Sequence, residues 1–159
     1  MRSSRHSWRS SATVLAAGLF VATATVAACG AGATSAPSAA APLVSGAWIR
    51  VPAGPDQPAA AYFTIKNPGS QADALLSVSS TMASACRLHE TSMDSSGMTG
   101  MNMVDRLDVP AGGMTKLEPG GYHVMMTGVS SLTVGSKVEL SLTFQRAGVI
   151  KVMAEVRTG

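Results

Sequence analysis

The chain has 159 residues, of which 46% are hydrophobic, 13% are charged and 4% are aromatic. This length allows one domain, and the composition excludes a disordered tail protein and a base-stacking platform for single-stranded nucleic acid. The net charge of +3 comes from Arg2, Arg5 and Arg9, because the other nine basic residues are balanced by nine acidic ones. The rest of the chain lacks the positive excess that phosphate binding requires, so we do not expect nucleic acid as a partner.

The N-terminus has the pattern of a secretory signal peptide. Residues 2–9 carry positive charge, and residues 12–28 form an uncharged apolar stretch that is short for a membrane-spanning helix. The stretch ends in Val26-Ala27-Ala28-Cys29, which resembles the bacterial lipobox, a motif whose cysteine is lipidated and becomes the first residue. We therefore expect a lipoprotein signal peptide over residues 1–28 and a lipidated Cys29. The alternative is ordinary signal-peptidase cleavage near Ala28, with Cys29 incidental.

The segment that follows is expected to be a tether. Residues 29–44 are rich in Ala, Ser, Pro and Gly and show no hydrophobic periodicity, which is typical of a flexible linker. The predicted location is therefore extracytoplasmic, as a membrane-anchored lipoprotein of the cell envelope or the periplasmic face. The chain has two cysteines. If Cys29 carries lipid, Cys86 has no disulfide partner, and burial of a core must stabilise the domain.

From Ser45 onward the chain shows short period-2 patterns that are separated by turn residues such as Asn67-Pro68-Gly69. Residues 137–144 are the clearest example, because their apolar side chains fall on one side of a strand. No helical periodicity with caps is present, so we predict an all-β sandwich or small barrel over residues 45–159. The predicted strands are 47–51, 60–67, 74–79, 86–91, 103–107, 115–117, 121–127, 137–144 and 149–156.

Methionine and histidine are the residues that suggest chemistry. Four methionines lie within a segment rich in Ser and Gly, residues 93–103, which predicts a loop or ribbon rather than core: Met93, Met98, Met101 and Met103. Thioethers on a polar segment are unusual, because methionine normally fills gaps in a core. Outside the leader the chain has two histidines, His89 and His123, and each falls on a predicted strand.

The spacing of His123 and Met125, two positions apart, is the most informative feature for a metal site. Side chains at i and i+2 of a strand share a face, so these two point the same way, whereas Val124 and Met126 point towards the core. A neutral thioether binds Ca²⁺ and Mg²⁺ poorly and suits Cu(I) best. Since no thiolate or carboxylate cluster accompanies the histidines, the sequence favours a Cu(I) site over a zinc site.

Other interpretations of the same residues remain open. Either histidine alone is more often a surface residue than a ligand, Met125 alone more often packs, and the methionine-rich segment alone could be an oxidation sink or a contact patch. Cys86 lies three residues before His89 and would face the opposite side of a strand. We therefore interpret it as a small buried hydrophobic residue, which argues against a blue-copper centre.

Several segments resemble the periplasmic copper chaperones called PCu(A)C, over residues 46–156. They are Leu88-His89-Glu90, the methionine-rich segment, the run from Leu117 to Met125, and Leu140-Ser141-Leu142-Thr143-Phe144. The resemblance implies a cupredoxin-like Greek-key β-sandwich that binds one Cu(I) through two Met and two His. It also implies delivery of copper towards the Cu(A) site of cytochrome c oxidase. The partner would be the oxidase subunit that carries Cu(A), or an intermediary thiol copper chaperone.

The family motif places the ligands at His89, Met101, His123 and Met125. Met103 is the alternate to Met101, because it fits the local Met-x-Met pattern but lies two residues closer to His123. The competing function is a structural or interaction lipoprotein whose β-sandwich binds no metal. We do not expect an enzyme, because the sequence shows no nucleophile elbow, no phosphate-binding loop and no carboxylate pair beside a histidine.

Overall fold

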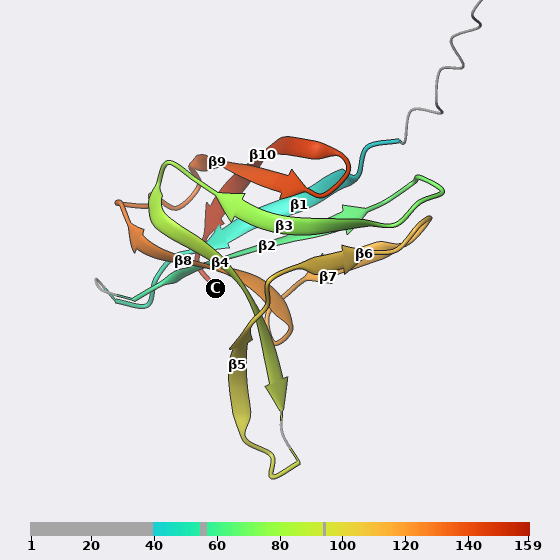
Figure 1. Cartoon of the computed structure of the whole chain (residues 1–159). Coiled ribbons are helices and arrows are strands. Elements are labelled where there is room, and N and C mark those ends of the chain that lie inside the picture. Colours follow the sequence, from blue (N-terminus) through green and yellow to red (C-terminus); the bar gives the residue numbers. More distant parts are fainter. Residues whose placement is uncertain (1–39, 55–56, 94) are drawn as a thin grey trace, which may run out of the picture. The chain divides into compact units, whose positions relative to one another are not determined.

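The computed structural model describes residues 40–54, 57–93 and 95–159, and these form ten β-strands and no helix (Figure 1). The predicted signal peptide, Cys29 and most of the tether lie outside the described residues. No helix of the described part is long and apolar enough to cross a membrane. The strands are β1 (Leu43–Arg50), β2 (Ala59–Lys66), β3 (Asp73–Ser79), β4 (Ala83–Met93), β5 (Thr99–Met103), β6 (Leu107–Val109), β7 (Met114–Leu117), β8 (Tyr122–Val129), β9 (Lys137–Phe144) and β10 (Gly148–Arg157).

The strands join edge to edge in the order β5-β4-β8-β2-β1-β10-β9-β3-β6, and β7 pairs with β2 beside this path. The β1–β10 pair is parallel, and the other pairs of the described strands are antiparallel. A bulge between Ser45 and Trp48, at Gly46 with its φ of 61°, lets β1 pair with β2 on both sides of the irregularity. The all-β fold class predicted from the sequence is confirmed.

One apolar core joins the two halves of this strand path. The inward residues of β2, β4 and β8 contact those of β3, β9 and β10, which is the arrangement of a sandwich. The predicted alternation in β9 is confirmed, because Val138, Leu140, Leu142 and Phe144 are all buried. Val124 and Met126 of β8 also enter the core, as their position in the strand predicts.

The connection before β6 was predicted wrongly. A strand over residues 103–107 does not form, because β5 ends at Met103, Val104 donates its N–H to the carbonyl of Leu88, and the chain then turns into β6. The methionine-rich segment instead supplies β5, which pairs with an extended β4. Of the two forms predicted for this segment, the ribbon is therefore the one observed, and its methionines are exposed rather than part of the core.

Replacement of Leu142 by alanine tests the sandwich core. Leu142 is fully buried in the core, so the change should lower the free energy of unfolding by about 2–5 kcal/mol. Val149 of β10 is exposed, and its replacement by alanine should cost less than about 0.5 kcal/mol. Urea denaturation of both variants measures the difference, and equal losses would contradict this description of the core.

Candidate metal centre

The two histidines predicted as ligands lie opposite each other in neighbouring strands. In the antiparallel pairing of β4 with β8, His89 is the direct partner of His123, and their ring centroids are 5.8 Å apart. Leu88, which precedes His89, and Val124, which follows His123, are buried in the core. Both imidazoles therefore lie on the outer face of this layer of the sandwich, which we call the site face.

The candidate thioethers lie on the same face. Met103 is the direct partner of His89, and Met101 is the partner of Thr91, which is two residues along β4 from His89. Met125 follows His123 by two residues in β8, so it shares the same side of the sheet. The pairing thus brings His89, Met101, His123 and Met125 to one face, together with the alternate residue Met103.

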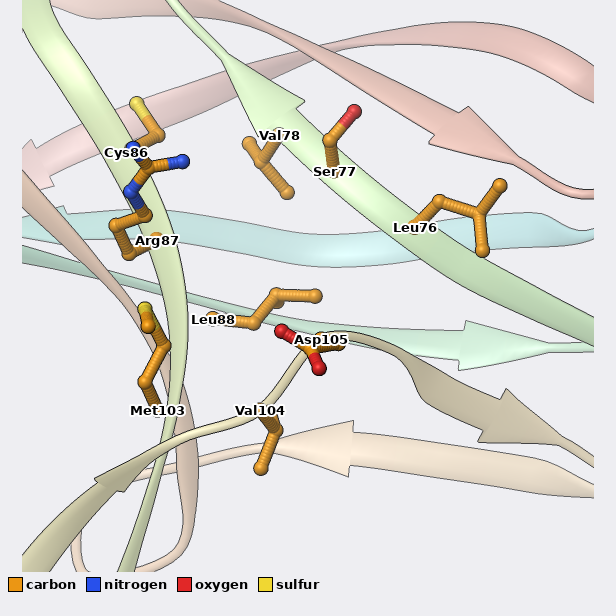
Figure 2. A pocket seen from close by; sticks show the side chains of 9 residues that line it. All are labelled: Leu76, Ser77, Val78, Cys86, Arg87, Leu88, Met103, Val104 and Asp105. Atoms are coloured by element: carbon orange, nitrogen blue, oxygen red, sulfur yellow. The ribbon is translucent and has the colours of Figure 1, made fainter.

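Met101 and Met103, the two candidate ligands on β5, line different hollows. Met101 borders a cavity of about 180 Å³ together with His123 and Met125. Met103 instead borders a separate hollow of about 330 Å³ with Arg87 and Cys86, as Figure 2 shows. Met101 is therefore the residue of β5 that lines the same space as the pair from β8.

A hydrogen bond orients the imidazole of His123. Its Nδ1 lies 3.1 Å from the carbonyl oxygen of Gly121. Because a carbonyl oxygen can only accept, Nδ1 carries a proton, so Nε2 is the nitrogen with the lone pair whenever the ring is neutral. This second contact fixes the tautomer, as it commonly does in metal-ligating histidines. His123 is only 7% exposed, so the ring is also held by packing.

His89 is favoured in its neutral form. Burial lowers the pKa of its imidazole below the ordinary value of 6.5, and the nearby His123 lowers it further. Its Nδ1 is shielded from solvent and has no hydrogen-bond partner among the described residues. A neutral imidazole with an unpartnered nitrogen fits the donor that a soft cation requires, and an unmet polar atom of this kind costs about 1–3 kcal/mol.

Comparison with known proteins assigns the family. Residues 43–156 match the family model of LpqE-like lipoproteins. The chain belongs to the LpqE-like family. A relative from Leifsonia xyli subsp. xyli, Lxx21020, is 32% identical over 115 residues, which are 72% of this chain and 68% of the relative, and it too is described by name as a lipoprotein.

Solved structures similar to this LpqE-like protein include PCuAC domains. The copper-bound PCuAC domain from PmoF2 has a TM-score of 0.63 at 24% identity, covering 74% of this chain and 93% of that one. Apo-DR1885 from Deinococcus radiodurans has a TM-score of 0.57 at 31% identity, covering 93% and 97%. The resemblance inferred from the sequence and its cupredoxin-like fold are both confirmed.

Cys86 of the LpqE-like chain lies on the other side of β4. It is the direct partner of buried Met126, packs against the core, and is half-buried rather than fully buried. Burial raises the pKa of its thiol, which keeps the sulfur protonated. In the described ranges no three residues of the types His, Cys, Asp and Glu cluster as a metal site would require.

Three residues beside the site were missed from the sequence. Tyr62 of β2 lies 6.5 Å from His123 between ring centroids and 4.6 Å from Trp48 of β1, so these rings continue the row of histidines across the sheet. The guanidinium of Arg50 lies 5.5 Å from the centre of the Tyr62 ring, and Arg50 borders the same cavity as Met101. Alternation in β2 could have placed Tyr62 opposite the core, but no local signal shows which strand lies beside it.

The coupling between the two imidazoles is measurable in the metal-free protein. Replacement of His123 by glutamine should raise the pKa of His89 by removing a nearby positive charge, yet leave it below 6.5 because burial, the larger cause, persists. NMR titration of the ring protons of His89 checks this.

The lowered pKa of His89 also determines how the free energy of unfolding changes with pH. Between the pKa of His89 in the fold and 6.5, the unfolded chain binds more protons, so the free energy of unfolding falls as the pH falls through that window. A pKa of His89 that stays unchanged or drops in His123→Gln would contradict the coupling.

Proposed function

We propose that this protein is an extracytoplasmic copper chaperone that binds one Cu(I) through His89, Met101, His123 and Met125. The observation that supports this most is the meeting of two imidazoles and the thioethers of β5 and β8 on one outer face. The role is that of a binding protein, which loads and releases copper as cargo. Its recipient is the Cu(A) site of cytochrome c oxidase, reached directly or through a thiol copper chaperone.

The donor set favours a soft cation with a single charge. Thioether sulfur and imidazole nitrogen are the ligands that select copper over Ca²⁺ and Mg²⁺. Arg50 borders the cavity, and Arg87 is the direct partner of Met125 on the same face. Repulsion from these two guanidinium groups grows in proportion to the charge of the bound ion, so it disfavours Cu²⁺ and Zn²⁺ about twice as strongly as Cu(I).

A similar protein supports the same cargo. CuI-DR1885 from Deinococcus radiodurans, which by its name carries Cu(I), is 32% identical to this chain with a TM-score of 0.56. The lipoprotein descriptions of the family and of the Leifsonia relative support anchoring through Cys29. An anchor there would keep the copper donor at the membrane face, where the oxidase is assembled.

The arrangement allows release by ligand exchange. Neutral ligands hold the ion without the strong attraction of a thiolate, so an acceptor that offers thiolates can displace them one at a time. His123 is buried and Met125 is half-buried, whereas Met101 is 60% exposed. The thioether of β5 is therefore the ligand that an acceptor reaches first.

Replacement of His123 by glutamine together with Met125 by leucine should abolish stoichiometric Cu(I) binding. Both new side chains are neutral and similar in size, so the fold should be retained. An anaerobic Cu(I) competition titration measures the binding, and circular dichroism checks the fold. The matched control is Met114→Leu with Met153→Leu, since both of these methionines are exposed and lie outside the site. Unchanged binding in the first variant would refute the site and favour an interaction lipoprotein.

The two methionines of β5 should differ in their effect on copper affinity. Met101 shares a cavity with His123 and Met125, whereas Met103 borders the hollow beside Cys86. Met101→Leu should weaken Cu(I) binding roughly tenfold or more, which is about 1.4 kcal/mol, and Met103→Leu should weaken it less. The same titration ranks the two variants, and a larger loss in Met103→Leu would move the ligand to that position.

A further inference from the structure

The methionines of the β4–β5 hairpin are arranged on one side. In its pairing, Met93 is the partner of Thr99, Thr91 of Met101, and His89 of Met103. Direct partners share a face, and so do residues two apart in a strand. Met93, Met101 and Met103 therefore lie on the site face, in line with the imidazole of His89.

The opposite side of the hairpin is polar. There the side-chain amide of Asn102 donates a hydrogen bond of 3.2 Å to the hydroxyl of Ser92, and Gly100 faces Ser92 across the strands. The separation produces one row of soft donors that leads to the histidines.

The row is accessible along its length. Met93 is 72% exposed, Met101 60% and Met103 64%, and every residue of β5 is exposed. Figure 1 shows the hairpin of β4 and β5 extending away from the other strands of the sandwich. These side chains consequently add little to the core, so packing does not account for them.

We propose that the hairpin carries a second, outer position for Cu(I), formed by the thioethers of Met93 and Met101, through which the ion reaches and leaves the histidine pair. This inference rests on the proposed function, because it describes the route of the same cargo. Met93 and Met101 are diagonal neighbours on the site face, for which Cα separations are about 7–8 Å, within the reach of two long flexible side chains. A pair of neutral thioethers makes a weak site, and weakness is what a transit position requires.

Met101 belongs to both positions, which makes the transfer stepwise. The bond from the ion to Met101 is kept while its bonds to His89, His123 and Met125 break and a bond to Met93 forms. No electron or proton moves in this step, and the charge of the complex is unchanged because every ligand is neutral. The ion is never released to water between the two positions.

The outer position can be isolated by disabling the inner one. In the full chain carrying His89→Gln and His123→Gln, Ag(I) is added as an air-stable soft cation, and the methionine methyl groups are followed by NMR. The methyl signals of Met93 and Met101 should shift together. Adding Met93→Leu to this background should remove the shift of Met101. Met114 and Met153 are the internal controls, because they are exposed and lie on β7 and β10.

Two outcomes would overturn the proposal. One is a Met93 signal that moves no more than those of Met114 and Met153, which would show general thioether affinity. The other is a Met101 shift that survives Met93→Leu. A separate experiment on the wild-type chain tests the inner site of the proposed function. If the first equivalent of Ag(I) leaves the signals of Met125 and the histidine rings unchanged, the inner site is wrong, whatever the result for the outer position. Unchanged amide signals elsewhere establish that the variants are folded.

Discussion

The register between β4 and β8 is the constraint on which the site depends. Because side chains alternate along a strand, a slip of one residue would turn His89 towards the core and Leu88 towards solvent. Leu88 and Val124 are direct partners on the core side, and Cys86 and Met126 are partners one step further along. Burial of these four side chains stabilises the register, so the packing of the core determines which groups meet on the opposite face.

The sequence predicts the parts of this arrangement that depend on period-2 alternation. The shared face of His123 and Met125, the buried side of β9 and the orientation of Cys86 all follow from it, and the structure agrees. The pairing of strands distant in sequence does not follow, so Tyr62 and Arg50 were missed. The sequence left open whether residues 93–103 form a loop or a ribbon, because glycine and polar residues disfavour a strand. Pairing with β4 overrides that preference and forms β5.

Charge explains why such a site can lie against a folded core. A buried carboxylate or thiolate needs a compensating partner and is costly without one. Here the candidate donors are thioethers and imidazoles, the thiol of Cys86 stays protonated on the core side, and a carbonyl oxygen orients His123. In the proposed function, the guanidinium groups of Arg50 and Arg87 would favour a cation of single charge without either contributing a ligand atom.

The two sides of the candidate site differ in mechanical support, and this difference determines which side can move. β8 is hydrogen-bonded to β4 on one side and to β2 on the other, so His123 and Met125 are held within the sheet. Among the described strands, β5 ends the strand path and pairs with β4 alone. Beyond Thr91 no third strand of the described ranges pairs with the hairpin, and a two-stranded ribbon is marginally stable by itself. Local opening is therefore easiest at β5, where the backbone hydrogen bonds are exposed to water. In the proposed route, the hairpin can therefore move with the ion bound to the thioether of Met101, while the imidazoles keep their positions in the sheet.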